Sequence, residues 1–233
     1  MVVETAEPLD PASVLLTLHK SGLFTWKGEA QTKEQIVKRA GSSETVNRTP
    51  ILLEVESDAP FSVVRDALYV LTGDLHCVNY SFLVETKNGP GAVVLPMLAD
   101  RGMGYQFYEG RKEIRKVGGD GNEKHVEVVV SAGKNGEIIV KDINYLIPNT
   151  VVPTLEYIDP PPNRRAWTGA HLPFGMWTRE MLRTFLTRPD VAALGPYVLF
   201  KVTNYEPAAD VVCCLSALRT IGDVAVVPSI PTK

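Results

Sequence analysis

The feature that most constrains this chain is a strand and helix unit that occurs twice. The first copy has an aliphatic run at residues 51–55, then Pro60, and then a segment with an apolar stripe that ends at Leu71. The second copy has the same pattern 147 residues later, with a run at residues 198–202 followed by Pro207. No residue is inserted or removed between the two copies, which indicates a duplication that the flanking segments can test, since any two strand and helix units share part of this pattern.

Each copy combines the two hydrophobic periods that distinguish strands from helices. The aliphatic and β-branched run before each proline predicts a buried strand. After each proline, apolar residues recur at i, i+3, i+4 and i+7, which predicts a helix with one buried face. These residues are Val64, Ala67, Leu68 and Leu71 in the first copy and Val211, Cys214, Leu215 and Leu218 in the second. Proline suits the first turn of such a helix, because its missing N–H leaves no helical hydrogen bond unmade.

The flanking segments extend the repeat on both sides. In the first half they predict a hairpin at residues 13–26, a helix that Thr32 and Gln35 begin with a capping box, and a last strand at residues 78–84. In the second half they predict a hairpin around Asn135-Gly136, a helix capped by Thr178 and a last strand at residues 223–227. We therefore predict an α+β fold of two tandem β-β-α-β-α-β modules, each a small mixed sheet with two helices packed on one face.

The repeat also sets the predicted domain boundaries. The modules span residues 11–85 and 125–230, and a connector occupies residues 86–124. The two hairpin turns are only 114 residues apart, so the second module holds an insertion, at about residues 142–176. The prolines of this insertion, from Pro148 to the run at residues 160–162, exclude a continuous helix.

Composition excludes several classes of protein. The 233 residues are 45% hydrophobic and 22% charged with a net charge of −3, which is typical of a globular protein and shows no basic excess for nucleic acid. No run approaches the ~18 apolar residues that cross a bilayer, and the N-terminus lacks the features of a signal peptide. Three cysteines, Cys77, Cys213 and Cys214, argue against a disulfide scaffold, and Cys214 is predicted to be buried.

The turn after the first aliphatic run carries a family resemblance. It is rich in Ser and acidic residues, it is closed by Pro60 and Phe61, and a helix beginning Val63-Val64 follows it. A hairpin with a charged, Gly-containing turn at residues 19–22 precedes it. Together these segments resemble the periplasmic domain of the ExbD/TolR family of biopolymer transport proteins, over residues 11–84 and, less clearly, over residues 125–227. The second copy has Asn204-Tyr205-Glu206 in place of the acidic turn.

The resemblance implies a function without catalysis. Family members are subunits of inner-membrane systems driven by the proton gradient, for transport or envelope maintenance. Their partners are ExbB/TolQ-like membrane subunits, reached through an N-terminal membrane helix, and an envelope protein or peptidoglycan. No position of this sequence matches that helix, and residues 4–11 look like the linker that follows it, so a periplasmic location with an inner-membrane anchor outside this chain is expected.

A tandem copy would then make the chain a covalent pseudo-dimer. Further association of the whole chain into a homo-oligomer is left open. The competing class is a cytoplasmic tandem binding module unrelated to membrane motors. A third class, an enzyme with its site between the modules, has only the unexplained insertion in its favour.

A search for catalytic motifs supports the expectation of no enzyme, no cofactor and no metal. The sequence has no Gly-x-Ser-x-Gly, no phosphate-binding loop and no His-Glu-x-x-His. His76 and Cys77 are neighbours on a predicted strand and point to opposite faces. His19 has no ligand partner at metal-binding spacing. Glu56 and Asp58 could form a carboxylate pair, although helix capping by Asp58 is the simpler interpretation.

Candidate partner-binding residues are the aromatic and arginine side chains outside the repeat, because these types dominate interface energetics. They are Tyr105, Phe107 and Tyr108 in the connector and Arg164, Arg165, Trp167 and Trp177 at the insertion. The alternative is that the aromatic residues cover the joint between the modules.

Overall fold

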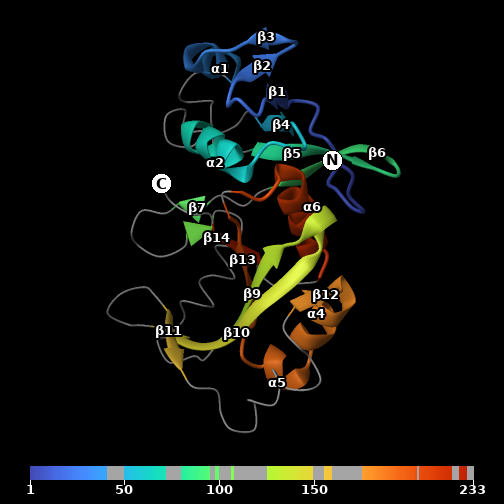
Figure 1. Ribbon diagram of the computed structural model, residues 1–233, viewed down its shortest axis with the longest axis vertical. Helices are drawn as coiled ribbons and strands as arrows, with labels where there is room; N and C mark the ends of the chain where they lie inside the picture. Colours follow the sequence, from blue (N-terminus) through green and yellow to red (C-terminus); the bar gives the residue numbers. More distant parts are fainter. Residues whose placement is uncertain are drawn as a thin grey trace. The chain divides into compact units, whose positions relative to one another are not determined.

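The structure is a computed structural model that describes most of the chain in segments. The described residues are 1–40, 50–71, 80–94, 98–99, 106–107, 125–148, 155–158, 175–203, 205–221 and 226–229. They divide into two compact units, the first made of Met1–Leu95 and Thr203–Ala217 and the second of Pro96–Val202 and Leu218–Thr232. The architecture is mixed α+β, with two mixed sheets and few helices, in agreement with the predicted fold class (Figure 1).

The first unit is built on a six-stranded sheet with the order β3-β2-β1-β4-β5-β6. Strand β4 lies parallel to β1 on one side and to β5 on the other. The pairs β1–β2, β2–β3 and β5–β6 are antiparallel. The strands span Val14–Leu18 (β1), Phe24–Trp26 (β2), Glu29–Ala30 (β3), Ile51–Val55 (β4), Tyr80–Thr86 (β5) and Gly89–Val94 (β6).

Two helices of the first unit lie where the sequence predicts them. Helix α1 spans Lys33–Ala40 and starts with a capping box: the Thr32 N–H donates to Gln35 Oε1 at 2.8 Å, and the Gln35 N–H donates to Thr32 Oγ1 at 3.3 Å. Helix α2 spans Phe61–Tyr69 directly after Pro60. The predicted apolar stripe from Val64 to Leu71 is confirmed, since each of its residues is at most 5% exposed.

The two faces of the first sheet differ in burial. Leu16, Leu18, Leu53 and Phe82 alternate along β1, β4 and β5 and are fully buried, so they form the core face. The opposite face is more open, and Leu15 on it is 42% exposed. This alternation is the pattern expected of a sheet that packs through one side.

Helix α6, which spans Ala208–Arg219, completes the first unit from the far end of the sequence. Its predicted stripe is confirmed, because Val211, Cys214, Leu215 and Leu218 are at most 1% exposed. The segment before the helix forms an isolated antiparallel bridge, Pro60 opposite Pro207. Residues that correspond across the repeat therefore meet within this unit.

The N-terminal strap, residues 1–7, is also part of the first unit. Its backbone bonds to Glu85 of β5 through the Val3 N–H and the Met1 carbonyl, and Glu7 and Ala92 exchange two bonds of 2.8 Å. On α6, the Ser216 hydroxyl donates to the Thr5 carbonyl at 2.7 Å. Within residues 4–11, which the resemblance identifies as a linker, Glu7 is therefore hydrogen-bonded to β6 and Thr5 to α6.

The second unit contains a sheet with the order β11-β10-β9-β13-β14, and β12 pairs with β10 beside this path. Strand β9 is antiparallel to β10 and parallel to β13, and β13 is parallel to β14. The strands span His125–Ala132 (β9), Ile138–Pro148 (β10), Leu155–Ile158 (β11), Gly175–Trp177 (β12), Tyr197–Lys201 (β13) and Val226–Ser229 (β14). A separate two-stranded sheet pairs β7 (Leu98–Ala99) with β8 (Gln106–Phe107).

The turns and helices of the second unit also follow local sequence signals. The short 3-10 turn Lys134–Gly136 joins β9 to β10, with Asn135 and Gly136 in the left-handed region at φ 57° and 81°. This confirms the predicted hairpin. Helix α4 spans Arg179–Leu186 and is followed by α5, Pro189–Ala192. Thr178 Oγ1 accepts the Met181 N–H at 3.1 Å, so the predicted cap is confirmed.

The structure differs from the predicted organisation in two segments. Strand β6, at the start of the predicted connector, pairs with β5 from Ser81 to Thr86 and belongs to the first sheet. Strand β10 continues to Pro148, inside the predicted insertion, where β11 pairs with it, and β12 pairs with its first residues, Ile138 to Val140. The β5–β6 hairpin has a local signal, Asn88-Gly89 at the turn between the two strands, which the domain boundary at residue 85 did not take into account. The pairing of β10 with β11 has no such local signal and depends on hydrogen bonds between the strands. Within the described segments, no helix is long and apolar enough to cross a bilayer.

Candidate functional site

Most of the candidate partner-binding residues have no described position. Tyr105, Tyr108, Arg164, Arg165 and Trp167 lie outside the described residues. Phe107 lies in β8, where its backbone pairs with Leu98. Their proposed role in binding stays a prediction.

Trp177 is the one candidate whose side chain is described, and it lies in the core of the second unit. It is 3% exposed, and its ring contacts Phe185 of α4 edge-to-face, with centroids 5.7 Å apart and planes at 77°. Strand β12 places it opposite Ile138 of β10. These contacts support a packing role for Trp177 at the start of α4.

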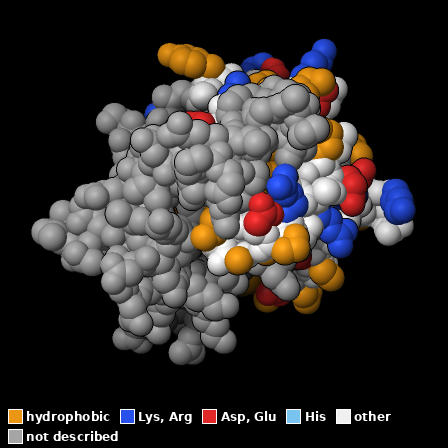
Figure 2. Space-filling model, turned by 90° about the horizontal axis from the view of Figure 1, so that it is seen from below, with side chains coloured by type: hydrophobic (Ala, Val, Ile, Leu, Met, Phe, Trp, Pro, Cys, Tyr) orange, Lys and Arg blue, Asp and Glu red, His pale blue; other side chains and the backbone are white. Residues whose placement is uncertain are grey.

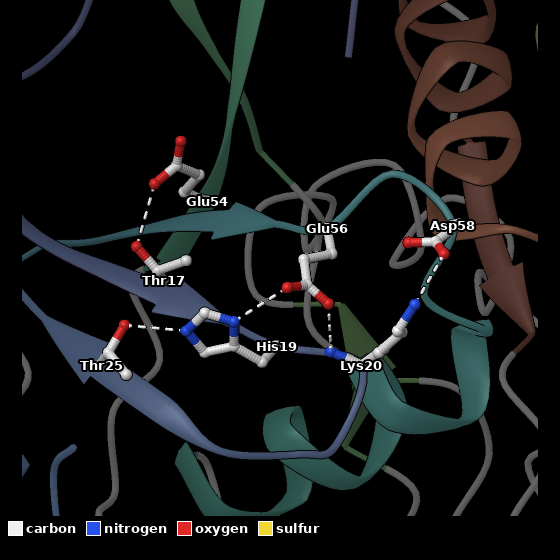
Figure 3. Close-up of polar contacts among 7 residues, drawn as sticks. All are labelled: Thr17, His19, Lys20, Thr25, Glu54, Glu56 and Asp58. Atoms are coloured by element: carbon white, nitrogen blue, oxygen red, sulfur yellow. Dashed lines mark hydrogen bonds and ion pairs between the residues drawn. The ribbon is translucent and has the colours of Figure 1, made fainter. Parts of the chain in front are cut away.

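A polar cluster on the first sheet has a better-defined geometry. We call it the His19 cluster, and it consists of His19, Lys20, Thr25, Glu56 and Asp58 (Figure 3). His19 and Lys20 directly follow β1, and Glu56 and Asp58 follow β4. Because β1 and β4 are parallel neighbours, their carboxyl ends meet at one edge of the sheet. Ligands of parallel sheets commonly bind at this edge.

Glu56 is the centre of the hydrogen bonds in this cluster. Its Oε1 lies 2.9 Å from His19 Nδ1, and its Oε2 accepts the backbone N–H of Lys20 at 2.8 Å. The other ring nitrogen, His19 Nε2, lies 3.0 Å from Thr25 Oγ1 on β2. Lys20 in turn donates to Asp58 Oδ2 at 3.1 Å. The cluster therefore joins the β1–β2 turn to the loop between β4 and α2.

The charges of the cluster stabilise one another. The Lys20 backbone N–H, followed by the His19 side chain, lowers the pKa of Glu56. The hydrogen bond from Lys20 lowers the pKa of Asp58, and the same bond raises the pKa of Lys20. Lys20 and Asp58 are 62% and 68% exposed, so solvent screens this ion pair and its contribution to stability is small.

Sequence reasoning considered two of the five residues of this cluster and misassigned one of them. It selected Glu56 and Asp58 but not His19, although the order of the parallel strands would have brought it to the same edge. The expectation that Asp58 caps the following helix is wrong. Pro60 is the N-cap of α2 and no side chain caps that end, because the Asp58 carboxylate bonds to Lys20 instead.

The cluster is suited to polar recognition at a surface. The side chains of His19 and Glu56 are 35% and 36% exposed, so both are accessible to solvent although they are hydrogen-bonded to each other. Two residues earlier on each strand, and on the same sheet face, Thr17 Oγ1 donates to Glu54 Oε2 at 2.9 Å. This bond extends the row of polar side chains along β1 and β4. Among the described residues, no group of three or more His, Cys, Asp or Glu side chains is arranged to hold a metal ion.

A second polar row crosses the sheet of the second unit. Glu127 on β9 accepts the Tyr197 hydroxyl at 2.7 Å and the Asn144 amide at 3.0 Å. Tyr197 and Asn144 lie directly opposite Glu127 on the two neighbouring strands. All three side chains therefore project from one sheet face, and their mutual bonds indicate a role in holding the strands in register.

The cysteines of α6 are poorly suited to nucleophilic chemistry. Burial raises the pKa of the Cys214 thiol, and Cys214 has no exposed surface. Burial also raises the pKa of Cys213, whose Sγ donates to the Val2 carbonyl at 3.3 Å. A reactive cysteine needs the opposite shift, toward the thiolate.

The described surface carries mixed charge. In the face that Figure 2 shows, Lys and Arg side chains alternate with Asp and Glu over the described part. Such a surface favours partners whose charges pair with individual side chains, rather than partners attracted by a large patch of one charge sign.

Comparison with known proteins identifies no relative. No family model, curated protein or solved structure matches the chain.

Proposed function

We propose that the chain is a non-enzymatic periplasmic interaction domain of an ExbD/TolR-like system, coupled to the proton gradient, for transport or envelope maintenance. In this proposal it consists of two tandem β-β-α-β-α-β modules that act as a covalent pseudo-dimer. Its ligand is a partner protein or peptidoglycan, and ExbB/TolQ-like subunits anchor the system in the inner membrane.

The observation that carries the proposal is the shared strand order of the two sheets. The order β2-β1-β4-β5 occurs within the first sheet and the order β10-β9-β13-β14 within the second. In each, the first pair is antiparallel and the next two pairs are parallel. The strands correspond one to one along the sequence, which supports the tandem modules and, with them, the resemblance to the ExbD/TolR domain.

The polar surface of the first unit supports binding rather than catalysis. The His19 cluster presents polar side chains that reach solvent, while burial raises the pKa of both cysteines of α6 and Cys214 is fully buried. Solvent-accessible polar side chains are typical of the rim of interfaces.

Cell fractionation tests the proposal directly. The gene is tagged at its own locus, the inner membrane is isolated and solubilised in detergent, and proteins bound to the chain are identified by mass spectrometry. We expect the chain in the inner-membrane fraction together with a polytopic membrane subunit. Binding of the purified chain to peptidoglycan is measured in parallel by co-sedimentation.

A folding variant controls for non-specific sedimentation with peptidoglycan. Leu53→Asp places a charge at a fully buried position of β4 and should unfold the first unit, so the purified variant should lose its binding to peptidoglycan. Recovery of the wild-type chain in the cytoplasm without a membrane partner would contradict the proposal. That result would favour a cytoplasmic tandem binding module.

A further inference from the structure

The bridge between Pro60 and Pro207 is symmetric in its hydrogen bonds. The Phe61 N–H donates to the Glu206 carbonyl, and the Ala208 N–H donates to the Ala59 carbonyl, each at 2.8 Å. Each donor follows its proline and each acceptor precedes its proline. Exchanging the segments 59–61 and 206–208 therefore reproduces the same pair of bonds.

This geometry explains why both central residues are prolines. In an antiparallel bridge of this kind the two opposed residues exchange no hydrogen bond with each other, so neither needs an N–H. Proline also suits the position before a helix: Pro60, at φ −66° and ψ 144°, is the N-cap of α2, and α6 begins at Ala208 after Pro207. One residue type thus satisfies the bridge and both helix starts.

The bridge is buried on one side only. Ala59, Phe61 and Ala208 have no exposed surface, whereas Pro60 and Glu206 are half-buried and Pro207 is exposed. Both segments belong to the first unit, although 147 residues separate them in the sequence. The contact therefore joins distant segments of the chain through equivalent positions of the repeat.

We propose that residues 59–61 form a self-recognition element, which pairs with a copy of itself. In this chain the copy is residues 206–208, and when that copy is prevented from pairing, the element binds residues 59–61 of a second copy of the chain. Such a contact is isologous, because the same donor and acceptor serve on both sides. The inference rests on the tandem organisation proposed above.

The substitution Ala208→Pro tests the inference within the full chain. Proline at the first residue of α6 is compatible with the helix, and its ring replaces the N–H that donates to Ala59. The preceding residue keeps the extended conformation that a helix N-cap already needs. Ala208→Ser is the matched control, since serine is small and keeps the N–H.

Each variant also carries Pro60→Cys, which reports pairing between two chains. Opposed residues of a bridge of this kind have Cα atoms about 4.5 Å apart, within the range that a disulfide spans. Both proteins are oxidised under mild conditions, and the peptides joined through position 60 are identified by mass spectrometry, which distinguishes them from products of the native cysteines. We expect interchain bonds at position 60 to be at least about tenfold more abundant with Ala208→Pro than with Ala208→Ser.

Two results would overturn the inference. The first is a folded Ala208→Pro variant, verified by circular dichroism, that forms no more interchain bond than the control. If that variant does not fold, the double variant Pro60→Cys with Pro207→Cys is tested instead, in the otherwise unchanged chain. An intrachain disulfide between positions 60 and 207 is expected, and its absence is the second result that overturns the inference. Both readouts are independent of cell fractionation, so failure here would leave the proposed membrane system standing.

Discussion

At the scale of single residues, Gly91 allows the N-terminal strap to lie against β6. A Cβ atom at this position would lie 2.6 Å from Ala6 Cβ and 3.1 Å from the Glu7 carbonyl oxygen. The strap bonds at this point to Ala92, so it cannot withdraw without losing two hydrogen bonds of 2.8 Å. Glycine is therefore required here for close backbone approach rather than for an unusual φ.

We predict that Gly91→Ala lowers the free energy of unfolding by about 1–3 kcal/mol, because the added methyl overpacks the contact with the strap. Urea unfolding of the purified chain measures this change. The double variant Gly91→Ala with Ala6→Gly removes the nearest clashing atom and should recover part of the loss. An unchanged stability for Gly91→Ala would show that the strap does not lie on β6.

At the scale of single residues, Glu56 also makes the stability of the folded chain depend on pH. Its pKa is lower in the folded chain than the ordinary value of 4.5, so folding favours its ionised form. The resulting stability is present above that ordinary value and is lost as the pH falls through the lowered one. The effect is limited, because the carboxylate is accessible to solvent.

We predict that Glu56→Gln lowers stability at about pH 7 and that its difference from the wild-type chain shrinks by about pH 3. Unfolding by urea at both pH values measures this difference. Glu29→Gln, on the exposed edge strand β3 of the same sheet, is the control and should change stability less. A constant difference between Glu56→Gln and the wild-type chain would contradict the assigned role of the carboxylate.

At the scale of elements, helix caps and tight turns could be predicted from the sequence. The capping box of α1, the cap of α4 and the Asn135-Gly136 turn were all predicted, because each depends on residues within one turn of the chain. The apolar stripes of α2 and α6 were predicted for the same reason.

The elements that were missed depend on pairing between strands. Strand β10 runs on to Pro148 because β9 and β11 supply its partners, and prolines in that region conceal the pattern. Only two of the five residues of the His19 cluster were considered from the sequence, since only the parallel pairing of β1 with β4 brings His19 to Glu56. The strap has no periodic signal of its own and is held by backbone bonds and by Ser216.

We predict that Thr178→Ala lowers the free energy of unfolding by about 1 kcal/mol, because the Met181 N–H loses its acceptor at the start of α4. Thr178→Ser keeps the hydroxyl and should cost only a small part of this. Thermal and urea unfolding of the two variants measure the difference. Equal losses for both would show that packing, and not the hydrogen bond, is the contribution of Thr178.

At the scale of the whole molecule, the first unit contains most of a helix from the far end of the sequence. Helix α6 brings a buried stripe to this unit and is preceded by the segment that pairs with residues 59–61. If the chain arose by duplication of a module that paired with itself, both the bridge and the shared strand order follow from one event. The central claim is therefore that equivalent residues of two modules pair at Pro60 and Pro207.

Amide hydrogen exchange of Phe61 and Ala208, measured by NMR, tests this claim most directly. Both are the first residues of helices, where an N–H has no partner within the helix and normally exchanges fast. The account predicts that both amides are protected to a similar degree and that Phe61 loses its protection in Ala208→Pro. Exchange of both amides at the rate of an unstructured chain, in a folded protein, would contradict it.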